Sequence, residues 1–299
     1  METDRCVIQK AGRKSGLKIL VTGANGYLGQ GIVKQLLDDG VYVVAAGHTA
    51  DMIDKRAEIK SCDLFSIENP YEYFGKPDAV LHLAWHNGFK HSAESHITEL
   101  PDHYMFFKKL IEEGIHKVTV MGSVHEIGFY EGSVDENTPT NPQSLYGIAK
   151  NSLRQAVEIK CKECGTEFQW IRGFYIVGNT SYGCSIFSKI TEAENENKKE
   201  FPFTTGMNQF DFIDYNRFCR QVSAVVEQDD VSGIINCCSG RPERIGDRVE
   251  RFIADNNYHI KLQYGAFPER SYDSKAIWGN SKKIESIIEK KKEQDNYNA

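Results

Sequence analysis

The chain has 299 residues, 40% hydrophobic and 26% charged, so it can bury a sizeable core in one large unit or two interlocked units. A net charge of −6 excludes the basic surface typical of nucleic-acid binding. No apolar run approaches the roughly 20 residues of a membrane span, so we expect no membrane partner. The eight cysteines are scattered and no apolar signal peptide is visible, so we expect reduced thiols and a cytoplasmic location.

One cysteine pair, Cys161-Lys-Glu-Cys164, has the spacing of metal or redox motifs. No second Cys or His pair at ligand spacing accompanies it. We therefore interpret the pair as two cysteines near a helix end, and we expect no metal site.

An apolar run followed by three glycines comes first. Lys18-Ile-Leu-Val-Thr22 suits a strand buried on both faces, and Gly23-Ala-Asn-Gly26-Tyr-Leu-Gly29 leads from it into a stretch with helical spacing. Such a turn lets the backbone approach a pyrophosphate, while the helix N-terminus offers N–H groups and a positive dipole end. The turn therefore predicts a dinucleotide cofactor, bound by Gly23, Asn25, Gly26, Tyr27, Leu28 and Gly29.

The end of the second predicted strand, 41–46, bears on which cofactor is bound. It is followed by Gly47-His48-Thr49, with no acid until Asp51. An NAD site usually places Asp or Glu at this point to bind the ribose hydroxyls. The sequence instead leaves room for a 2′-phosphate near His48, Thr49, Lys55 or Arg56, so we expect NAD(H) or NADP(H), with NADP(H) mildly favoured.

Two further strand ends supply cofactor contacts. Asp63 follows a third short strand, where it can meet the adenine amino group or cap a helix. A fourth strand over 79–84 ends beside Trp85, at the carboxyl edge where open α/β sheets bind ligands. We interpret His82 inside it as a core histidine. The contacts expected here are His48, Asp63, Leu64, Leu83, Ala84 and Trp85.

The stretch Tyr146-Gly-Ile-Ala-Lys150 carries the predicted chemistry. On a helix, the i,i+4 spacing puts both side chains on one face. An ammonium beside a phenol favours the phenolate, so the pair suits acid–base work on an alcohol or carbonyl. Ser123 follows a fifth strand over 117–121 and can hydrogen-bond the same oxygen.

The order of elements predicts the fold class. Strands and helices alternate through a long helix over 146–164 and a sixth strand over 168–172. This alternation predicts an α/β fold with a doubly wound parallel sheet. After Gly173 the alternation breaks into shorter elements. The charged tail over 289–299 and the polar stretch over 1–16 are expected to be flexible ends.

In combination, these motifs resemble the extended short-chain dehydrogenase/reductases. The motifs that follow that family's order, over roughly residues 18–287, are the glycine turn, His82-Leu-Ala84, Ser123, Tyr146 with Lys150, and Arg172-Gly-Phe-Tyr-Ile-Val-Gly178. The resemblance implies a Rossmann domain that binds NAD(P) over 17–175 and an interleaved smaller lobe that binds a nucleotide sugar over 176–288. It also implies a homodimer, formed through the helices around 104–113 and 146–164.

The resemblance also implies a role for each site residue. Ser123 would orient the substrate oxygen, Tyr146 would exchange the proton, and Lys150 would hold the nicotinamide ribose and depress the pKa of the tyrosine. Ile176 would contact the nicotinamide amide. The residues expected to bind the sugar nucleotide are His125, Asn179 and Arg270.

Two departures narrow the choice of subfamily. Val124-His125 stands where the 4,6-dehydratases have Asp and Glu, so a dehydratase is not expected. Phe210-Asp-Phe-Ile213 lacks an arginine that the family often has there. The chain most resembles the 4-keto-6-deoxyhexose reductases, first those of the dTDP-6-deoxy-L-talose 4-dehydrogenase type and next the dTDP-rhamnose-forming reductases.

The expected activity is therefore NAD(P)H-dependent reduction of the C4 ketone of a nucleotide-linked 4-keto-6-deoxyhexose, with a dTDP-sugar favoured. A nucleotide-sugar 4-epimerase uses the same triad without net redox and is the first alternative. A cofactor-sensing regulatory protein is the alternative from another class, but such proteins usually lack the tyrosine–lysine pair.

Overall fold

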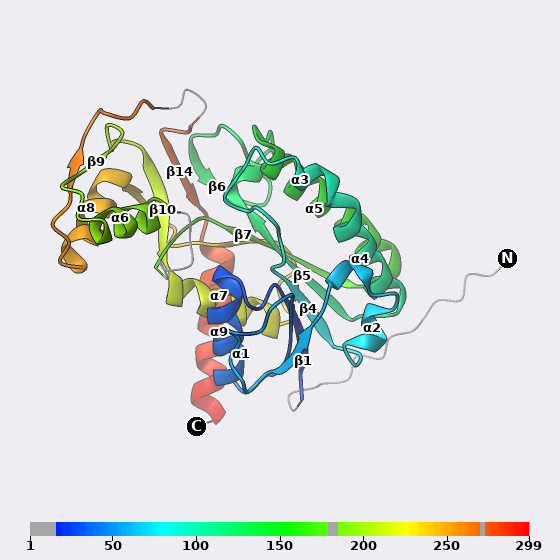
Figure 1. The fold of residues 1–299 in the computed structure, drawn as a ribbon. Coiled ribbons are helices and arrows are strands. Elements are labelled where there is room, and N and C mark those ends of the chain that lie inside the picture. The colour runs from blue at the N-terminus through cyan, green and yellow to red at the C-terminus, as the bar shows by residue number, and fades with distance from the viewer. Residues whose placement is uncertain (1–15, 179–184, 270–272, 299) are drawn as a thin grey trace.

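A parallel sheet of seven strands forms the centre of the molecule (Figure 1), in a computed structural model that describes residues 16–178, 185–269 and 273–298. The strand order is β11-β7-β5-β4-β1-β2-β3, and every adjacent pair is parallel. The bounds are β1 Lys18–Thr22, β2 Tyr42–Gly47, β3 Glu58–Ser61, β4 Ala79–His82, β5 Lys117–Ser123, β7 Glu167–Gly173 and β11 Gly233–Cys237.

Helices cover both faces of this sheet, which explains why its strands are apolar on both sides. One face carries α1 (Tyr27–Asp38), α7 (Tyr215–Glu227) and α9 (Lys282–Asn298). The other carries α2 (Pro70–Tyr73), α4 (Leu100–Glu112) and α5 (Leu145–Cys164), with α3 (Ser95–Thr98) and the short η1 (Leu64–Ser66) packed against them. The predicted doubly wound, Rossmann-like α/β fold is confirmed.

A smaller lobe is built around a second sheet. Its strand order is β12-β10-β14-β6, and β8 also pairs with β10. Phenylalanines from its strands and helices, among them Phe187, Phe212 and Phe252, make a separate core. The bounds are β6 Gly132–Val134, β8 Tyr175–Val177, β10 Gln209–Asp214, β12 Pro242–Arg244 and β14 Ala276–Gly279, with β9 Glu200–Pro202 paired to β13 Lys261–Gln263, and with helices α6 Ile186–Asn195 and α8 Ile245–Asp255.

The two sheets are interleaved along the chain. Strand β6 lies between β5 and β7 of the large sheet in sequence, yet it pairs with β14 of the smaller sheet. Strand β11 and helices α7 and α9 come late, yet they belong to the large sheet and its core. Each sheet therefore contains strands from both sides of the boundary expected at residue 175. In the described parts of the chain, no helix has the length and apolarity needed to cross a membrane.

The C-terminal tail differs from the expectation of a flexible end over 289–299. Helix α9 continues to Asn298. Its first turns bury Ile284 and Ile287 against the sheet, and Lys291 then places its Nζ 2.7 Å from Asp39 and 2.6 Å from Glu227. The charged composition suggested a flexible end, but the Lys291 ammonium holds the helix to Asp39 and Glu227.

Replacing Lys291 by Ala should lower the free energy of unfolding by about 1–3 kcal/mol, because two carboxylates that now share one ammonium are left facing each other. Urea unfolding followed by circular dichroism measures this change. Lys292→Ala, at the exposed neighbouring position, is the matched control and should shift the free energy by less than about 0.5 kcal/mol. Equal effects of the two variants would contradict the docking role.

Candidate functional site

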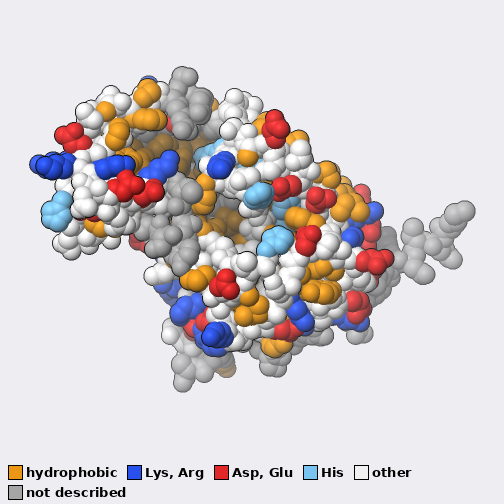
Figure 2. Space-filling view, in the orientation of Figure 1, with side chains coloured by type: hydrophobic (Ala, Val, Ile, Leu, Met, Phe, Trp, Pro, Cys, Tyr) orange, Lys and Arg blue, Asp and Glu red, His pale blue; other side chains and the backbone are white. Residues whose placement is uncertain are grey.

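The strand order reverses between β1 and β4, and ligands of open α/β sheets bind beyond the carboxyl ends of such strands. The two strand ends are joined at this point by a hydrogen bond of 2.8 Å between Thr22 Oγ1 and His82 Nδ1. The end of β5, with Ser123, lies next to them. Figure 2 shows the surface hollowed where the two lobes meet.

The glycine turn after β1, where the phosphates of a dinucleotide are expected, has no room for side chains at two of its glycines. Gly23 has φ +68°, and a Cβ on it would lie 2.6 Å from the backbone nitrogen of Ala84. A Cβ on Gly29 would lie 2.3 Å from the carbonyl oxygen of Gly23. Helix α1 then begins after Gly26 with no side-chain cap, and the first-turn N–H groups of such a helix suit an anion such as a pyrophosphate.

Residues after β2 and β3 surround the position expected for the adenosine. Asn25 Nδ2 donates to Thr49 Oγ1 at 2.6 Å, which joins the glycine turn to the segment that contains His48. Asp63 caps η1 by accepting from the Phe65 N–H at 3.3 Å. Arg56, a candidate for a 2′-phosphate, is held by Asp54 at 2.7 Å and by Asp38 at 2.8 Å.

Helix α5 delivers Tyr146 to the end of β5. Ser144 caps the helix, and the Tyr146 N–H donates to the His91 carbonyl at 3.0 Å. A Cβ on Gly147 would lie 2.4 Å from the His125 carbonyl oxygen, so only glycine permits this close approach. The Tyr146 hydroxyl consequently lies close enough to the side chain of Ser123 to interact with it.

Lys150 lies one turn further along α5 and is buried. Its Nζ donates to the Met121 carbonyl at 2.7 Å and lies 3.7 Å from the centre of the Trp85 ring. Burial lowers the pKa of Lys150 to about 7, although the Glu126 carboxylate opposes this shift. The structure thus brings Ser123, Tyr146, Lys150 and Trp85 together.

The pKa of Tyr146 differs from the family-based expectation. Burial raises it above its usual value of 10, and the nearby Ser123 side chain only partly offsets this. The expectation of a lowered pKa assumed a fully charged lysine, whereas burial weakens the charge of Lys150 itself. In this structure the phenol is therefore protonated at neutral pH.

Comparison with known proteins places this geometry in a family. Residues 19–238 match the family model described as "NAD dependent epimerase/dehydratase family". The chain belongs to this family. It is 40% identical, over 269 residues, to dTDP-6-deoxy-L-talose 4-dehydrogenase (NAD(+)) of Aggregatibacter actinomycetemcomitans, a match that covers 88% of this chain and 99% of the relative.

Solved structures agree with this epimerase/dehydratase fold. The UDP-N-acetylglucosamine 4-epimerase of Methanobrevibacter ruminantium M1, in complex with UDP-N-acetylmuramic acid, has a TM-score of 0.79 at 20% identity, covering 92% of both chains. The UDP-glucuronic acid 4-epimerase of Bacillus cereus, in complex with UDP-glucuronic acid and NAD, has a TM-score of 0.77 at 20% identity, covering 91% of this chain and 93% of the other.

Tyr27 of the glycine turn also joins the two lobes. Its hydroxyl donates to the Gly178 carbonyl at 2.9 Å, and its own carbonyl accepts from the Tyr215 hydroxyl at 2.6 Å. Ile176 lies in β8, just before this contact. All the predicted cofactor contacts, including those of Tyr27, Leu28, Leu64, Leu83 and Ile176, remain predictions. Asn179 and Arg270, expected to bind substrate, lie outside the described residues.

Sequence reasoning missed His91 and His103, which lie beside Tyr146 and Trp85, although it had named His125 as a substrate contact. His91 stacks on the Tyr146 ring at 5.0 Å and 10°, and the His125 ring lies 4.3 Å from that of His91. His103 stacks on Trp85, with the ring centres 4.4 Å apart. It also shares a hydrogen bond of 2.9 Å with His82. His82 is buried in the core, as expected. Burial lowers the pKa of His103 to about 3, so it is neutral.

At the opposite end of the sheet, His116, Glu167 and Asp229 have ligand atoms within 4.8 Å of one another. The Lys117 Nζ lies 2.5 Å from Asp229 and already neutralises that carboxylate. Two of the three candidate ligands are exposed, as acidic surface groups commonly are. We therefore assign no metal to this cluster.

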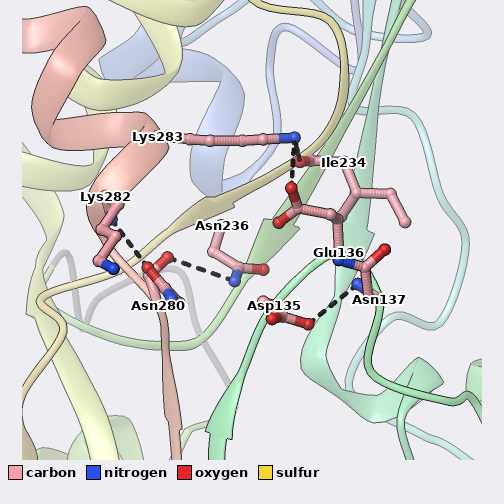
Figure 3. A pocket seen from close by; sticks show the side chains of 8 residues that line it. All are labelled: Asp135, Glu136, Asn137, Ile234, Asn236, Asn280, Lys282 and Lys283. Atoms are coloured by element: carbon pink, nitrogen blue, oxygen red, sulfur yellow. Dashed lines mark hydrogen bonds and ion pairs between the residues drawn. The ribbon is translucent and has the colours of Figure 1, made fainter.

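A pocket of about 200 Å³ lies apart from the triad (Figure 3). An ion pair of 3.2 Å between Lys283 and Glu136 crosses it, and Asn236 donates to the Asn280 carbonyl at 3.4 Å. None of the predicted site residues lines it. The lining residues are Asp135, Glu136, Asn137, Ile234, Asn236, Asn280, Lys282 and Lys283.

The buried ammonium predicts a pH dependence of stability. The pKa of Lys150 is about 7 in the folded protein and 10.5 in its ordinary state, so the unfolded chain binds more protons between these values. The free energy of unfolding should therefore rise with pH in this window, by up to about 1.4 kcal/mol per pH unit, relative to Lys150→Met. Urea unfolding of both proteins between about pH 7 and 10 measures the difference. Parallel curves would contradict the assignment.

Proposed function

We propose that the protein reduces the C4 ketone of a dTDP-linked 4-keto-6-deoxyhexose with NADH, or catalyses the reverse oxidation. The proximity of the Tyr146 hydroxyl to Ser123 at the end of β5, with the buried Lys150 ammonium one turn further along α5, is the observation that carries the proposal. The name of the 40% identical relative describes hydride chemistry at position 4 of a dTDP-6-deoxy sugar with NAD(+). Its match covers both lobes, and so includes the lobe proposed to bind the sugar.

Tyr146, Ser123 and Lys150 would each have a separate role in the reaction. The nicotinamide, when bound, supplies or accepts the hydride. Tyr146, protonated at neutral pH because burial raises its pKa, gives its proton to the oxygen that becomes the C4 hydroxyl. Ser123 hydrogen-bonds the same oxygen and so stabilises the charge that develops on it. Lys150 favours the phenolate that remains.

NAD(H) is the cofactor that we propose, in place of the mild preference for NADP(H) based on sequence. The arginine nearest the expected 2′-phosphate position, Arg56, is neutralised by Asp54 and Asp38. A 2′-phosphate placed there would meet two carboxylates as well as one guanidinium, and like charges at short range are costly. The relative's name also specifies NAD(+).

A substrate screen tests the reaction and the cofactor together. Purified protein is incubated with dTDP-, UDP-, GDP- and CDP-linked 4-keto-6-deoxyhexoses and with each reduced cofactor, and products are identified by NMR. We expect stoichiometric cofactor oxidation with the dTDP-sugar, and a kcat/KM at least about tenfold higher with NADH than with NADPH, which corresponds to about 1.4 kcal/mol. Interconversion of 4-hydroxy epimers without net redox would instead favour the 4-epimerase.

Tyr146→Phe should lower kcat by about three orders of magnitude, since it removes the proton donor. Fluorescence titration should show nearly unchanged NADH binding, because the ring and its stacking on His91 are retained. Tyr73→Phe, at an exposed position in α2, is the matched control and should keep full activity. A kcat within about threefold of the wild type would remove Tyr146 from the mechanism.

A further inference from the structure

A buried carboxylate supports the serine of the triad from behind. Glu126 is completely buried, at the end of the short helix η2 (Val124–Glu126) that Ser123 begins. The backbone N–H of Ser123 donates to Glu126 Oε1 at 2.6 Å, and the Ser123 Oγ accepts from the His125 N–H at 3.2 Å. This reciprocal capping box fixes the backbone from which the serine hydroxyl projects.

The other partners of Glu126 come from strand β7. Trp170 Nε1 donates to both carboxylate oxygens at 3.0 Å, and Arg172 Nε lies 3.8 Å away. All of these groups are donors, as an ionised carboxylate requires. Arg172 is also completely buried and donates through Nη1 to the carbonyl of Asp135, whose segment lines the pocket of Figure 3.

An ion pair at this depth is not explained by stability. Removing both charges from water costs several kcal/mol per ion, and apolar residues of similar volume often stabilise a protein as well or better. Arg172 Nε and Nη2 have no hydrogen-bond partner within the described residues, so the pair is not optimised as a structural contact. The Glu126 carboxylate, whose burial costs free energy, therefore lies directly behind the proposed active site.

Burial raises the pKa of Glu126, and Arg172, the Ser123 N–H and Trp170 oppose that shift. In its ionised form Glu126 acts on both ionisable members of the triad. It raises the pKa of Lys150 against the effect of burial, and it raises the pKa of Tyr146. The other groups that face Lys150 are the Met121 carbonyl, the Trp85 ring and the neutral pair His82 and His103. Arg172 and Arg154 face Glu126 from β7 and α5. Glu126 is thus the negative charge acting on Lys150 in the described part of the chain.

We propose that Glu126 is a positioning residue with two effects: it holds the backbone of Ser123, and it supplies a negative charge that favours the ammonium form of Lys150. Its effect on turnover rests on the proposed function, because Ser123 and Lys150 act in that reaction. Its effect on Lys150 does not, because the ammonium titrates whether or not the substrate has been identified correctly.

Two substitutions separate the two effects. Glu126→Gln keeps the length of the side chain and an oxygen that accepts from Ser123 N–H, but it removes the charge. Glu126→Asp keeps the charge but is one methylene too short to reach the Ser123 N–H. Asp211→Asn is the matched control, since Asp211 is equally buried and is held by donors from Ser239, Gly240 and Gly279 in the other lobe.

The first measurement is the titration of Lys150, followed by NMR of lysine labelled with 13C at Cε in cofactor-free protein. The Lys150 signal is assigned by its absence from Lys150→Met. In Glu126→Gln the midpoint should fall by about one pH unit, because a nearby opposite charge is lost. It should stay at the wild-type value in Glu126→Asp and Asp211→Asn. An unchanged midpoint in Glu126→Gln overturns the electrostatic effect.

The second measurement is the pH profile of kcat. The alkaline limb of Glu126→Gln should move to lower pH together with the NMR midpoint, while Glu126→Asp should lose about tenfold in kcat at every pH through misplacement of Ser123. Wild-type kcat in Glu126→Asp overturns the positioning effect. An inactive wild type counts against the proposed function alone, because the NMR titration still decides the effect on Lys150.

Glu126→Gln leaves Arg172 as an unpaired buried cation, and near-UV circular dichroism checks that the variant folds. If it does not fold, Glu126→Gln combined with Arg172→Met removes both charges together. Arg172 does not act on Lys150 directly, so the double variant should show the same lowered Lys150 midpoint. A wild-type midpoint in the double variant overturns the proposal equally.

Discussion

The close approach of helix α5 to the carboxyl end of β5 is the constraint on which the site depends. It requires glycine at position 147, because a Cβ there would collide with the His125 carbonyl oxygen. It also buries the ammonium of Lys150 against the Met121 carbonyl. The same contact therefore brings the phenol to the serine and weakens the charge of the lysine, so that position and acidity in this site are set together.

Much of the architecture could be predicted because strands buried on both faces and a glycine turn leave local signals. The Tyr146 and Lys150 pair could be found from its helical spacing and the strand before it. His91 could not, because its place over the Tyr146 ring follows from the path of a loop. Glu126 stands three residues after Ser123, which is capping-box spacing, but its burial becomes visible only once β7 is placed behind it.

The charged segments show where composition misleads. Arg56 read as a candidate phosphate ligand because it follows the second strand, yet two carboxylates from separate segments neutralise it. Lys291 was predicted to lie in a flexible end, yet its ammonium lies between Asp39 and Glu227. Asp54 is a near neighbour of Arg56 in the same loop, but Asp38, Asp39 and Glu227 lie in or at the end of other helices. The charge of a segment therefore does not reveal whether that charge is available.

The order in which the chain visits its two sheets has a consequence for biosynthesis. Strand β11, at one edge of the large sheet, is made after β6, β8, β9 and β10 of the smaller lobe. Helix α9, which covers a face of the large sheet, is made after every described strand of that lobe. The large sheet therefore cannot be completed during translation before β11 has been made. The edge of β7 stays open until β11 arrives, and this growing intermediate is the form in which the chain would need a chaperone most.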